Sequence, residues 1–315
     1  MRDGFGREIT YLRLSVTERC TLRCTYCRAD EGCCPKEAEL SARDLVRVAN
    51  ACADLGITRV RLTGGEPLLR RDILQIVAGI REIPGIRDIS LTTNAQMLTE
   101  VASGLKQAGL DRINISLDSL KPEVFYQMTG GSLEKVLQGI EASIKAGLNP
   151  IKINVVLVRG LNDLEVDDFI QLTRDNALDV RFIEYMPIGA GTRSDHLRVD
   201  NTELIKQHSG LQPIPPRNPG QPSRDFQIPG YKGRVGFISP ISHQFCADCN
   251  RIRVISDGSL RTCLGQEMEI PLLPALAEGD EALREVIKQA VMSKPAGHHF
   301  RLEHLNARGM SNIGG

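Results

Sequence analysis

The chain has 315 residues, and its 39 Lys and Arg balance its 39 Asp and Glu, so the formal net charge is zero. A balanced charge gives no support for binding nucleic acid or a membrane surface through bulk electrostatics. No stretch reaches the roughly 18 continuous apolar residues of a membrane-spanning helix, and the first residues lack the apolar core of a signal peptide. We therefore expect a cytoplasmic protein with no nucleic-acid or membrane partner.

Strands and helices alternate through the first two thirds of the chain. Strands are expected at residues 9–16, 57–63, 88–93, 112–117, 151–158 and 180–185. Helices are expected between them, at residues 41–55, 68–81, 99–108, 133–146 and 165–176, with helical turns from Pro122. This alternation predicts a parallel sheet covered by helices. Six units are fewer than the eight of a closed barrel, so the predicted fold class is α/β, with a partial (β/α)6 TIM-like barrel over residues 1–197.

The composition changes from Arg198 onward. Residues 213–230 are rich in Pro, Gly and Gln and predict a loop. Short strands at 235–239, 252–256 and 260–262 and a helix at 278–292 follow. Residues 198–315 are thus predicted to form a small C-terminal α+β extension that covers the open mouth of the barrel and ends in Gly314-Gly315.

The most informative motif is a cysteine triad in the loop after the first predicted strand. Cys20, Cys24 and Cys27 have the spacing C-x3-C-x2-C. A closed [4Fe–4S] cluster uses four thiolates, so three would leave one iron open to a small molecule. The alternative is a structural zinc site, which would need a fourth ligand at finger-like spacing. Histidine is absent before His196, which argues against zinc.

A second triad lies in the extension. Cys246, Cys249 and Cys263 have the spacing C-x2-C-x13-C, with no cysteine after them. Two triads suggest two clusters, each with one open iron. A zinc knuckle with His243 as the fourth ligand is the alternative for this group.

Three cysteines remain outside the triads. Cys52 lies in an apolar helical stretch and is expected to be a buried small hydrophobe. The adjacent Cys33 and Cys34 are expected not to be ligands, and the sequence does not assign them a role.

With Tyr26 just before its third cysteine, the first triad resembles that of the radical S-adenosylmethionine (SAM) superfamily. Both triads, the run Asn250-Arg251-Ile252-Arg253 and the Gly-Gly end resemble the GTP 3′,8-cyclase family of molybdenum cofactor biosynthesis, along essentially the whole chain. The resemblance implies two [4Fe–4S] clusters and SAM, with one cluster in residues 1–197 and the second in 198–315. SAM cleavage would give a 5′-deoxyadenosyl radical, which takes hydrogen from ribose C3′ of GTP. Attack of C3′ on C8 then gives (8S)-3′,8-cyclo-7,8-dihydroguanosine 5′-triphosphate.

The resemblance also assigns site residues by motif. It implies that SAM is contacted by Tyr26, Gly65, Ser116 and Met186. Gly65 belongs to the turn Gly64-Gly65-Glu66-Pro67, where the lack of a side chain permits close approach of the backbone to a ligand. By itself such a turn is weak evidence, because Gly and Pro also simply make turns, and Met186 is open to the alternative of ordinary core packing.

Four cations fall within predicted strands: Arg13, Arg61, Lys152 and Arg181. Charged side chains are seldom buried unless paired, so these four suggest an anion in the barrel, although each Arg could instead face solvent. The strand register around Lys152 is hard to fix from the sequence.

The resemblance places all four cations at the GTP site with three further residues, Thr92, Arg251 and Arg253. Arg251 and Arg253 would share one face of a strand, and the family uses this segment for GTP. The resemblance implies catalytic parts for Arg251, Arg253, Gly314 and Gly315, and the alternative for the last two is a frayed terminus.

Two positions depart from the family pattern, namely Ala29 in place of the usual Pro and Ala95 in place of the usual Gly.

Two rival functions stay open from the residues alone: another twin-cluster radical SAM enzyme such as a peptide maturase, and a non-catalytic iron–sulfur electron carrier. Expected partners are GTP, an electron donor such as a flavodoxin or ferredoxin, and cyclic pyranopterin monophosphate synthase downstream. A homodimer is one oligomeric state to test.

Overall fold

The structure is a computed structural model that describes residues 1–315 except 28–38, 189–194, 299, 301–308 and 315. The strands are β1 (Tyr11–Ser15), β2 (Arg59–Thr63), β3 (Asp88–Thr93), β4 (Arg112–Ser116), β5 (Ile151–Leu157), β6 (Leu178–Glu184), β7 (Gln212–Pro213), β8 (Ser223–Gln227), β9 (Arg234–Ile238), β10 (Arg251–Val254), β11 (Ser259–Arg261) and β12 (Ile270–Pro271). The α-helices are α1 (Ala42–Asp54), α2 (Ile73–Arg81), α3 (Leu98–Gln107), α4 (Pro122–Thr129), α5 (Leu133–Lys145), α6 (Val166–Asp175), α7 (Asn201–Gln207), α8 (Leu273–Glu278) and α9 (Asp280–Met292).

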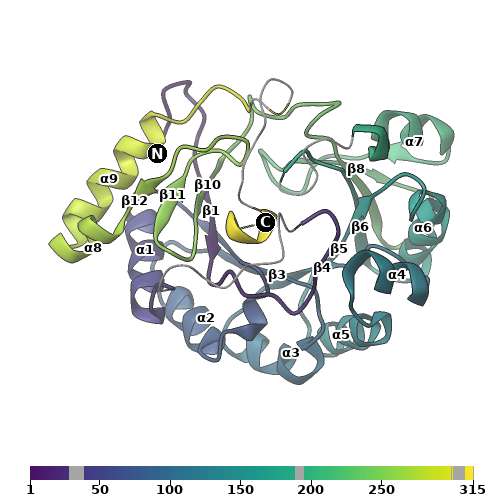
Figure 1. The fold of residues 1–315 in the computed structure, drawn as a ribbon, viewed down its shortest axis with the longest axis horizontal. Helices are drawn as coiled ribbons and strands as arrows, with labels where there is room; N and C mark the ends of the chain where they lie inside the picture. The colour runs from purple at the N-terminus through teal and green to yellow at the C-terminus, as the bar shows by residue number, and fades with distance from the viewer. Residues whose placement is uncertain (28–38, 189–194, 299, 301–308, 315) are drawn as a thin grey trace.

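All of these strands belong to one sheet, in the order β12-β11-β10-β1-β2-β3-β4-β5-β6-β9-β8-β7. The six central strands β1 to β6 are parallel, as the βα alternation predicts. Helices α1 to α6 lie around the outside of the curved sheet, and the turn η5 (Met310–Asn312) lies inside it, close to the end of the chain (Figure 1). None of the described helices is long and apolar enough to cross a membrane.

The extension adds strands to both edges of the barrel sheet. Strand β10 pairs in parallel with β1, and β9 pairs in parallel with β6. Parallel pairing therefore continues without a break from β10 to β9, through strands drawn from both halves of the chain. The cover over the mouth stays a prediction, and what the structure shows is that strands of the extension lengthen the barrel sheet at both edges.

The prediction of a loop over 213–230 is wrong in part. Strand β8 lies within it and pairs antiparallel with β9, and β7 pairs with β8. The Pro and Gly residues around it made this five-residue strand hard to recognise in the sequence. Its hydrogen-bond partner, β9, lies beside it only in the folded chain. Phe226 of β8 packs edge-on against Phe237 of β9, with ring centroids 5.6 Å apart. Helices α7 and α8 were likewise not expected from the sequence.

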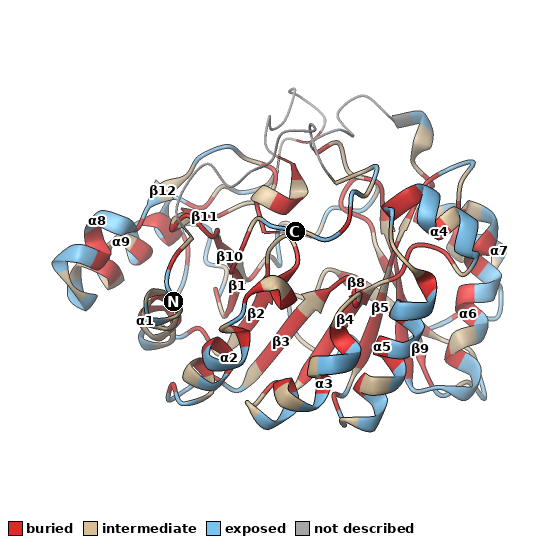
Figure 2. Cartoon of the chain, turned by 60° about the horizontal axis from the view of Figure 1, so that its bottom comes forward, coloured by how far each residue is buried: buried red, intermediate tan, exposed pale blue. Residues whose placement is uncertain are grey.

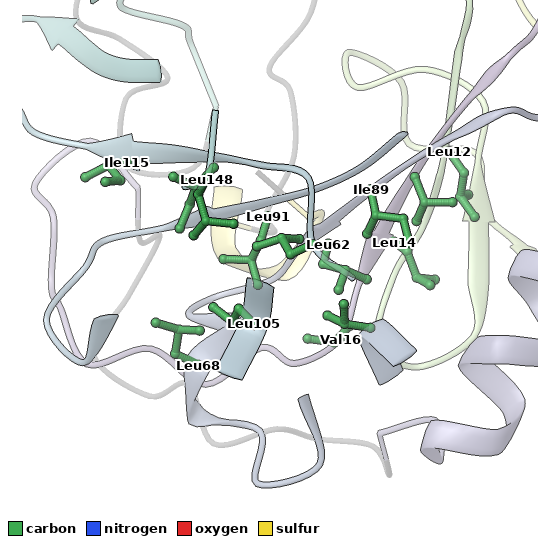
Figure 3. Close-up of a cluster of buried hydrophobic side chains, with 14 of the residues drawn as sticks. Leu12, Leu14, Val16, Leu62, Leu68, Ile89, Leu91, Leu105, Ile115 and Leu148 are labelled. Carbon is green, nitrogen blue, oxygen red and sulfur yellow. The ribbon is translucent and has the colours of Figure 1, made fainter. Parts of the chain in front are cut away.

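The core lies between the sheet and the outer helices. Leu12 and Leu14 of β1 are fully buried there with Leu62 and Leu91 from the next strands (Figure 3). Buried strands and exposed outer helix faces separate clearly in Figure 2. Because successive strand residues face opposite sides, the same strand that buries Leu12 and Leu14 directs Arg13 to the interior of the barrel.

Local signals fix the helix ends as the sequence predicts. The Ser41 side chain accepts a hydrogen bond from the backbone N–H of Asp44 at the start of α1. Such a cap contributes roughly 1 kcal/mol. Gly56 follows the end of α1 with φ of 96°, a conformation that glycine adopts without steric cost.

Candidate functional site

One cavity of about 350 Å³ collects residues from both halves of the chain. All six triad cysteines line it: Cys20, Cys24, Cys27, Cys246, Cys249 and Cys263. It is also lined by every residue that the resemblance assigns to SAM or GTP: Tyr26, Gly65, Ser116, Met186, Arg13, Arg61, Thr92, Lys152, Arg181, Arg251 and Arg253. The sheet thus brings together residues that the sequence separates by more than two hundred positions.

The first triad occupies the loop after β1. The backbone N–H groups of Arg23 and Thr25 donate to carbonyl groups at the end of α4, at 2.9 Å each, and anchor the loop there. Burial raises the pKa of Cys24 well above its ordinary value, and neighbouring charges of Asp118 and the other two cysteines add to this rise. The three thiols are therefore close enough to influence one another. Positive charge from bound iron would favour the thiolate forms and so reverse this rise in pKa, which fits a set of thiolate ligands.

In the second triad, Cys246 and Cys249 lie between β9 and β10, and Cys263 follows β11. Burial alone would raise the pKa of Cys249, but the charges of Arg251 and Lys294 lower it to about 6. A thiol with such a pKa is mostly thiolate at neutral pH, the form that binds metal. His243 is exposed and does not line the cavity, so the geometry gives no support to a zinc knuckle with this residue as fourth ligand.

Neither triad is pre-shaped around a single ion. Among the described residues, no set of three or more His, Cys, Asp or Glu side chains is arranged to hold one metal ion. Cluster ligands stand at separate corners of a cubane and so lie further apart than the ligands of one ion.

Three arginines form a row across neighbouring strands. Arg13 of β1 is in register with Arg61 of β2 on one side and with Arg253 of β10 on the other. Burial, followed by the charges of Arg253 and Arg61, holds the pKa of Arg13 well below its usual value. The Arg13 Nε atom and the Thr92 Oγ1 atom are buried without a hydrogen-bond partner among the described residues. A row of like charges with unsatisfied donors is a site that an anion would stabilise.

The opposite wall carries Lys152 and Arg181. Arg181 donates to the side-chain oxygens of Asn114 at 2.9 Å and Asn154 at 2.6 Å, so its guanidinium is held in place. Lys152 aligns with Asn114 across β4 and β5, which settles the register that the sequence left open. Its Nζ lies 3.9 Å from a carboxylate oxygen of Asp179. Burial, with the charge of Arg181, lowers the pKa of Lys152 to about 7.

Tyr26, which the resemblance assigns to SAM, is fixed by a carboxyl group that sequence reasoning missed. The Tyr26 hydroxyl donates to Asp118 at 2.7 Å, and burial raises the pKa of Asp118 to about 6. Asp118 also accepts from the backbone N–H of Val156 at 2.9 Å. Its place two residues after Ser116, at the carboxyl end of β4, is the signal that could have identified it.

The Gly64-Gly65 turn packs against the loop of the first triad. The N–H of Gly65 donates to the carbonyl of Thr17 at 2.7 Å, and the N–H of Glu66 donates to the carbonyl of Arg19 at 2.7 Å. A Cβ at Gly65 would overlap the backbone of Glu18 and Arg19. Glycine is therefore required here by the approach of the cysteine loop as well as by any ligand.

Glu66 ties the ends of β2 and β3 together, a role that the turn motif did not reveal. Its buried carboxylate accepts from the Thr93 hydroxyl and the Asn94 N–H, both at 2.7 Å. Burial raises its pKa to about 7, while these hydrogen bonds lower it. Ala95, next in the chain, adopts φ of 61°, the one positive φ among described residues other than glycine. Ala95 thus adopts a left-handed conformation that glycine would adopt with less strain.

The C-terminal segment enters the site. The carbonyl of Gly314 accepts from Arg253 Nη1 at 2.8 Å and from Thr63 Oγ1 at 3.3 Å. Gly314 has φ of 72°, and a Cβ there would lie 3.1 Å from the Cβ of Ser15. This buried position is not that of a frayed end. Gly315, like Ala29, Cys33 and Cys34, lies outside the described residues.

Several lining residues were not expected from the sequence, and they are Tyr11, Arg59, Arg112, Asp118 and Glu184. Arg59 and Arg61 both lie against the Tyr11 ring, 5.5 and 5.4 Å from its centroid. Arg112 pairs with both oxygens of Asp88, at 2.8 and 2.5 Å. The alternation Arg59-Val60-Arg61 was the signal in the sequence that could have identified Arg59. Met186 both lines the cavity and packs against a small apolar cluster that contains Ile188 and Ile313, so its two interpretations are compatible.

Comparison with known proteins gives two adjoining matches. Residues 14–173 match the Radical SAM superfamily, and residues 178–300 match Molybdenum Cofactor Synthesis C. The chain is 45% identical to the GTP 3′,8-cyclase of Alkaliphilus oremlandii over 100% of both chains. It is 43% identical to that of Listeria monocytogenes serovar 1/2a, over 100% of this chain and 99% of the relative.

Among solved structures, Streptococcus suis SuiB bound to precursor peptide SuiA has a TM-score of 0.61. That likeness covers 93% of this chain and 72% of SuiB at 16% identity, and it shows a shared fold alone. The full-length identities, together with both adjoining matches, establish that the chain belongs to the GTP 3′,8-cyclase family of the radical SAM superfamily.

Proposed function

We propose that the cavity holds GTP between the two cysteine triads, with the triphosphate against the strand cations and guanine toward the second triad. Membership of the family gives the activity, GTP 3′,8-cyclase in molybdenum cofactor biosynthesis, and the cofactors, SAM and two [4Fe–4S] clusters. The observation that carries the residue assignment is that both triads and the arginine row line one cavity.

We assign the first cluster to Cys20, Cys24 and Cys27, and SAM to the neighbouring residues Tyr26, Gly65, Ser116 and Met186. When bound, the cluster and SAM together supply the radical that takes hydrogen from ribose C3′. The hydrogen bond from Tyr26 to Asp118 fixes the aromatic ring beside the triad, so little rearrangement is needed on binding.

The triphosphate would be bound from two walls. Arg13, Arg61 and Arg253 offer adjacent guanidinium groups from one wall, and Lys152 and Arg181 face it from the other. Guanidinium groups can bind phosphate oxygens through paired hydrogen bonds. Thr92 adds a hydroxyl group whose oxygen has no other partner among the described residues. The phosphate charge would relieve the mutual repulsion of these cations.

We assign the second cluster to Cys246, Cys249 and Cys263, where its open iron would face guanine. Arg251 and Arg253 lie on strand β10, which runs from the second triad toward the arginines proposed to bind the triphosphate. Gly314 would help to close the cavity around the substrate, since its carbonyl is held by Arg253, and a catalytic part is proposed for Gly315 from the family resemblance. A closed cavity excludes water and competing hydrogen donors.

The finer expectations are also proposals: the (8S) product, a cytoplasmic location, a flavodoxin or ferredoxin as electron donor, and cyclic pyranopterin monophosphate synthase as the next enzyme. Residues 1–197 and 198–315 are proposed as the two functional units, each carrying one cluster. A homodimer is the oligomeric state to test first.

Anaerobic turnover of the reconstituted protein with SAM, a reductant and each of the four nucleoside triphosphates tests the assignment. Only GTP should give a cyclised product, with SAM cleavage coupled to it. Equal turnover of ATP, or GTP turnover unaffected by Arg181→Ala and Cys246→Ser, would overturn the proposed placement of GTP.

A further inference from the structure

A buried arginine from the first residues of the chain reaches the second triad. Arg7 Nη1 donates to the carbonyl of Cys246 at 2.9 Å, and the same guanidinium donates to the carbonyls of Ala296 at 2.9 Å and Pro295 at 2.6 Å. Its side chain is only 8% exposed. The N-terminal segment is thereby tied at one point to a cysteine ligand and to the chain beyond α9.

Asp3 holds Arg7 in this position. Its fully buried carboxylate accepts from Arg7 Nε at 2.6 Å and from the backbone N–H groups of Phe5 and Arg7 at 2.9 and 3.0 Å. Both side chains have these partners, so the turn from Asp3 to Arg7 is a rigid support for the guanidinium.

A second buried cation, Lys294, contacts the segments that carry the other two cysteines of the triad. Lys294, 3% exposed, donates from Nζ to the carbonyl of Arg251 at 3.0 Å and to the carbonyl of Thr262. Arg251 follows Cys249 by two residues, and Thr262 directly precedes Cys263. These two carbonyls are its hydrogen-bond partners, and no carboxylate pairs with Lys294 among the described residues.

The two contacts are complementary. Arg7 donates to the segment that carries Cys246, and Lys294 donates to the segments that carry Cys249 and Cys263. Between them they join the N-terminal turn, the loop before β10 with the first residue of that strand, the residue after β11 and the residues after α9. Burying a charge costs free energy unless it is paired and hydrogen-bonded. Lys294 is buried with carbonyl partners and without a carboxylate among the described residues, which indicates a specific task at this place.

We propose that Arg7 and Lys294 are positioning residues for the second cluster, given that its ligands are the triad assigned above. They hold the three cysteine segments at cluster-binding spacing before iron arrives. Lys294 also supplies positive charge beside the segments that carry Cys249 and Cys263, which favours the reduced, more negative form of a cluster bound there.

The test compares Arg7→Lys, Lys294→Met and Lys294→Arg with Lys288→Met, a control lysine on the preceding helix α9 whose side chain is 62% exposed. After anaerobic reconstitution, the rate of iron release from the second cluster to a chelator should rise about tenfold in Arg7→Lys, the scale of one lost hydrogen bond. Lys294→Met should lower the midpoint potential of that cluster in a redox titration followed by EPR, and Lys294→Arg should restore it. Lys288→Met should match wild type.

Cys246→Ser separates this inference from the cluster assignment, because it should lose the second cluster in either case. Wild-type iron release in Arg7→Lys, together with an unchanged potential in Lys294→Met, would overturn the inference and leave the assignment standing. Retention of both clusters in Cys246→Ser would overturn the assignment itself. If Lys294→Met does not fold, as judged by circular dichroism, the release rate in Arg7→Lys alone decides.

Discussion

Arg13 on β1 lies in parallel register with Arg253 on β10, so the first and last strands around the cavity bring their arginines side by side. Arg13 comes from the half that carries the first triad, and Arg253 comes from the half that carries the second. Neither half therefore contains a complete site for the anion. The Arg253 guanidinium also binds the Gly314 carbonyl, which links this pair to the end of the chain.

Arg181→Ala should weaken GTP binding by about 1.5–3 kcal/mol, the scale of hydrogen bonds to charged groups. The loss should be smaller for guanosine, which has no phosphates. Equilibrium binding under anaerobic conditions measures both. Arg174→Ala, an exposed arginine on α6, is the control for the loss of one positive charge. Equal losses for GTP and guanosine would show that Arg181 acts on the base or the fold instead.

Cluster number is a direct test of the two triads. The reconstituted wild-type protein should hold about eight irons, four for each cubane. Cys246→Ser should hold roughly half and still cleave SAM, because the first triad is untouched. Iron and zinc analysis checks this, and about four irons with one zinc in the wild type would contradict two clusters.

GTP binding should take up a proton at Lys152. Its pKa is lowered to about 7 from 10.5 by burial, so between these values the unfolded chain binds more protons than the folded one. The free energy of unfolding of the GTP-free protein should therefore rise with pH through that window. A bound triphosphate favours the ammonium form and reverses the shift.

At pH 8, uptake of up to about one proton per GTP is expected from this shift. Calorimetry in buffers of different ionisation enthalpy measures the uptake. Lys152→Met should remove most of it, and uptake that persists in this variant would assign the proton to another group.

The C-terminal glycines should matter for cyclisation and little for stability. Removing Gly314 and Gly315 deletes no side chain, so both clusters and the melting temperature should persist, while GTP cyclisation falls and uncoupled SAM cleavage continues. Gly314→Ala should act in the same direction, because φ of 72° and the Ser15 Cβ at 3.1 Å disfavour a side chain there. Product and methionine formation report the two reactions separately. Unchanged cyclisation in both variants would show that this segment has no catalytic part.

Much of the barrel was predictable because its signals are local. The βα alternation located β2 to β6 and their helices, and Ser41 and Gly56 marked the ends of α1. The cysteine spacings singled out the two triads and the predicted strands singled out four cations, while the resemblance supplied the remaining residues that line the same cavity. Each of these signals is carried by residues close in sequence.

The rest depends on pairings that only the fold creates. Strand β8 lies in a Pro- and Gly-rich segment, and its partner β9 is needed to recognise it. Asp118 and Glu66 gain their importance from partners on other strands, Tyr26 and Thr93. Arg7 carries no expectation from the sequence, because its contact with Cys246 crosses nearly the whole chain. No periodicity in the sequence reports contacts of this kind.

The two outermost strands of the sheet, β7 and β12, have two residues each, and each contains a proline, Pro213 or Pro271. Such edges resist pairing with strands of another molecule, because proline cannot donate a backbone hydrogen bond. The edges of the six-stranded barrel alone would be β1 and β6, which are longer and lack proline. The extension therefore also protects the barrel against edge-to-edge aggregation, and residues 1–197 produced alone should self-associate.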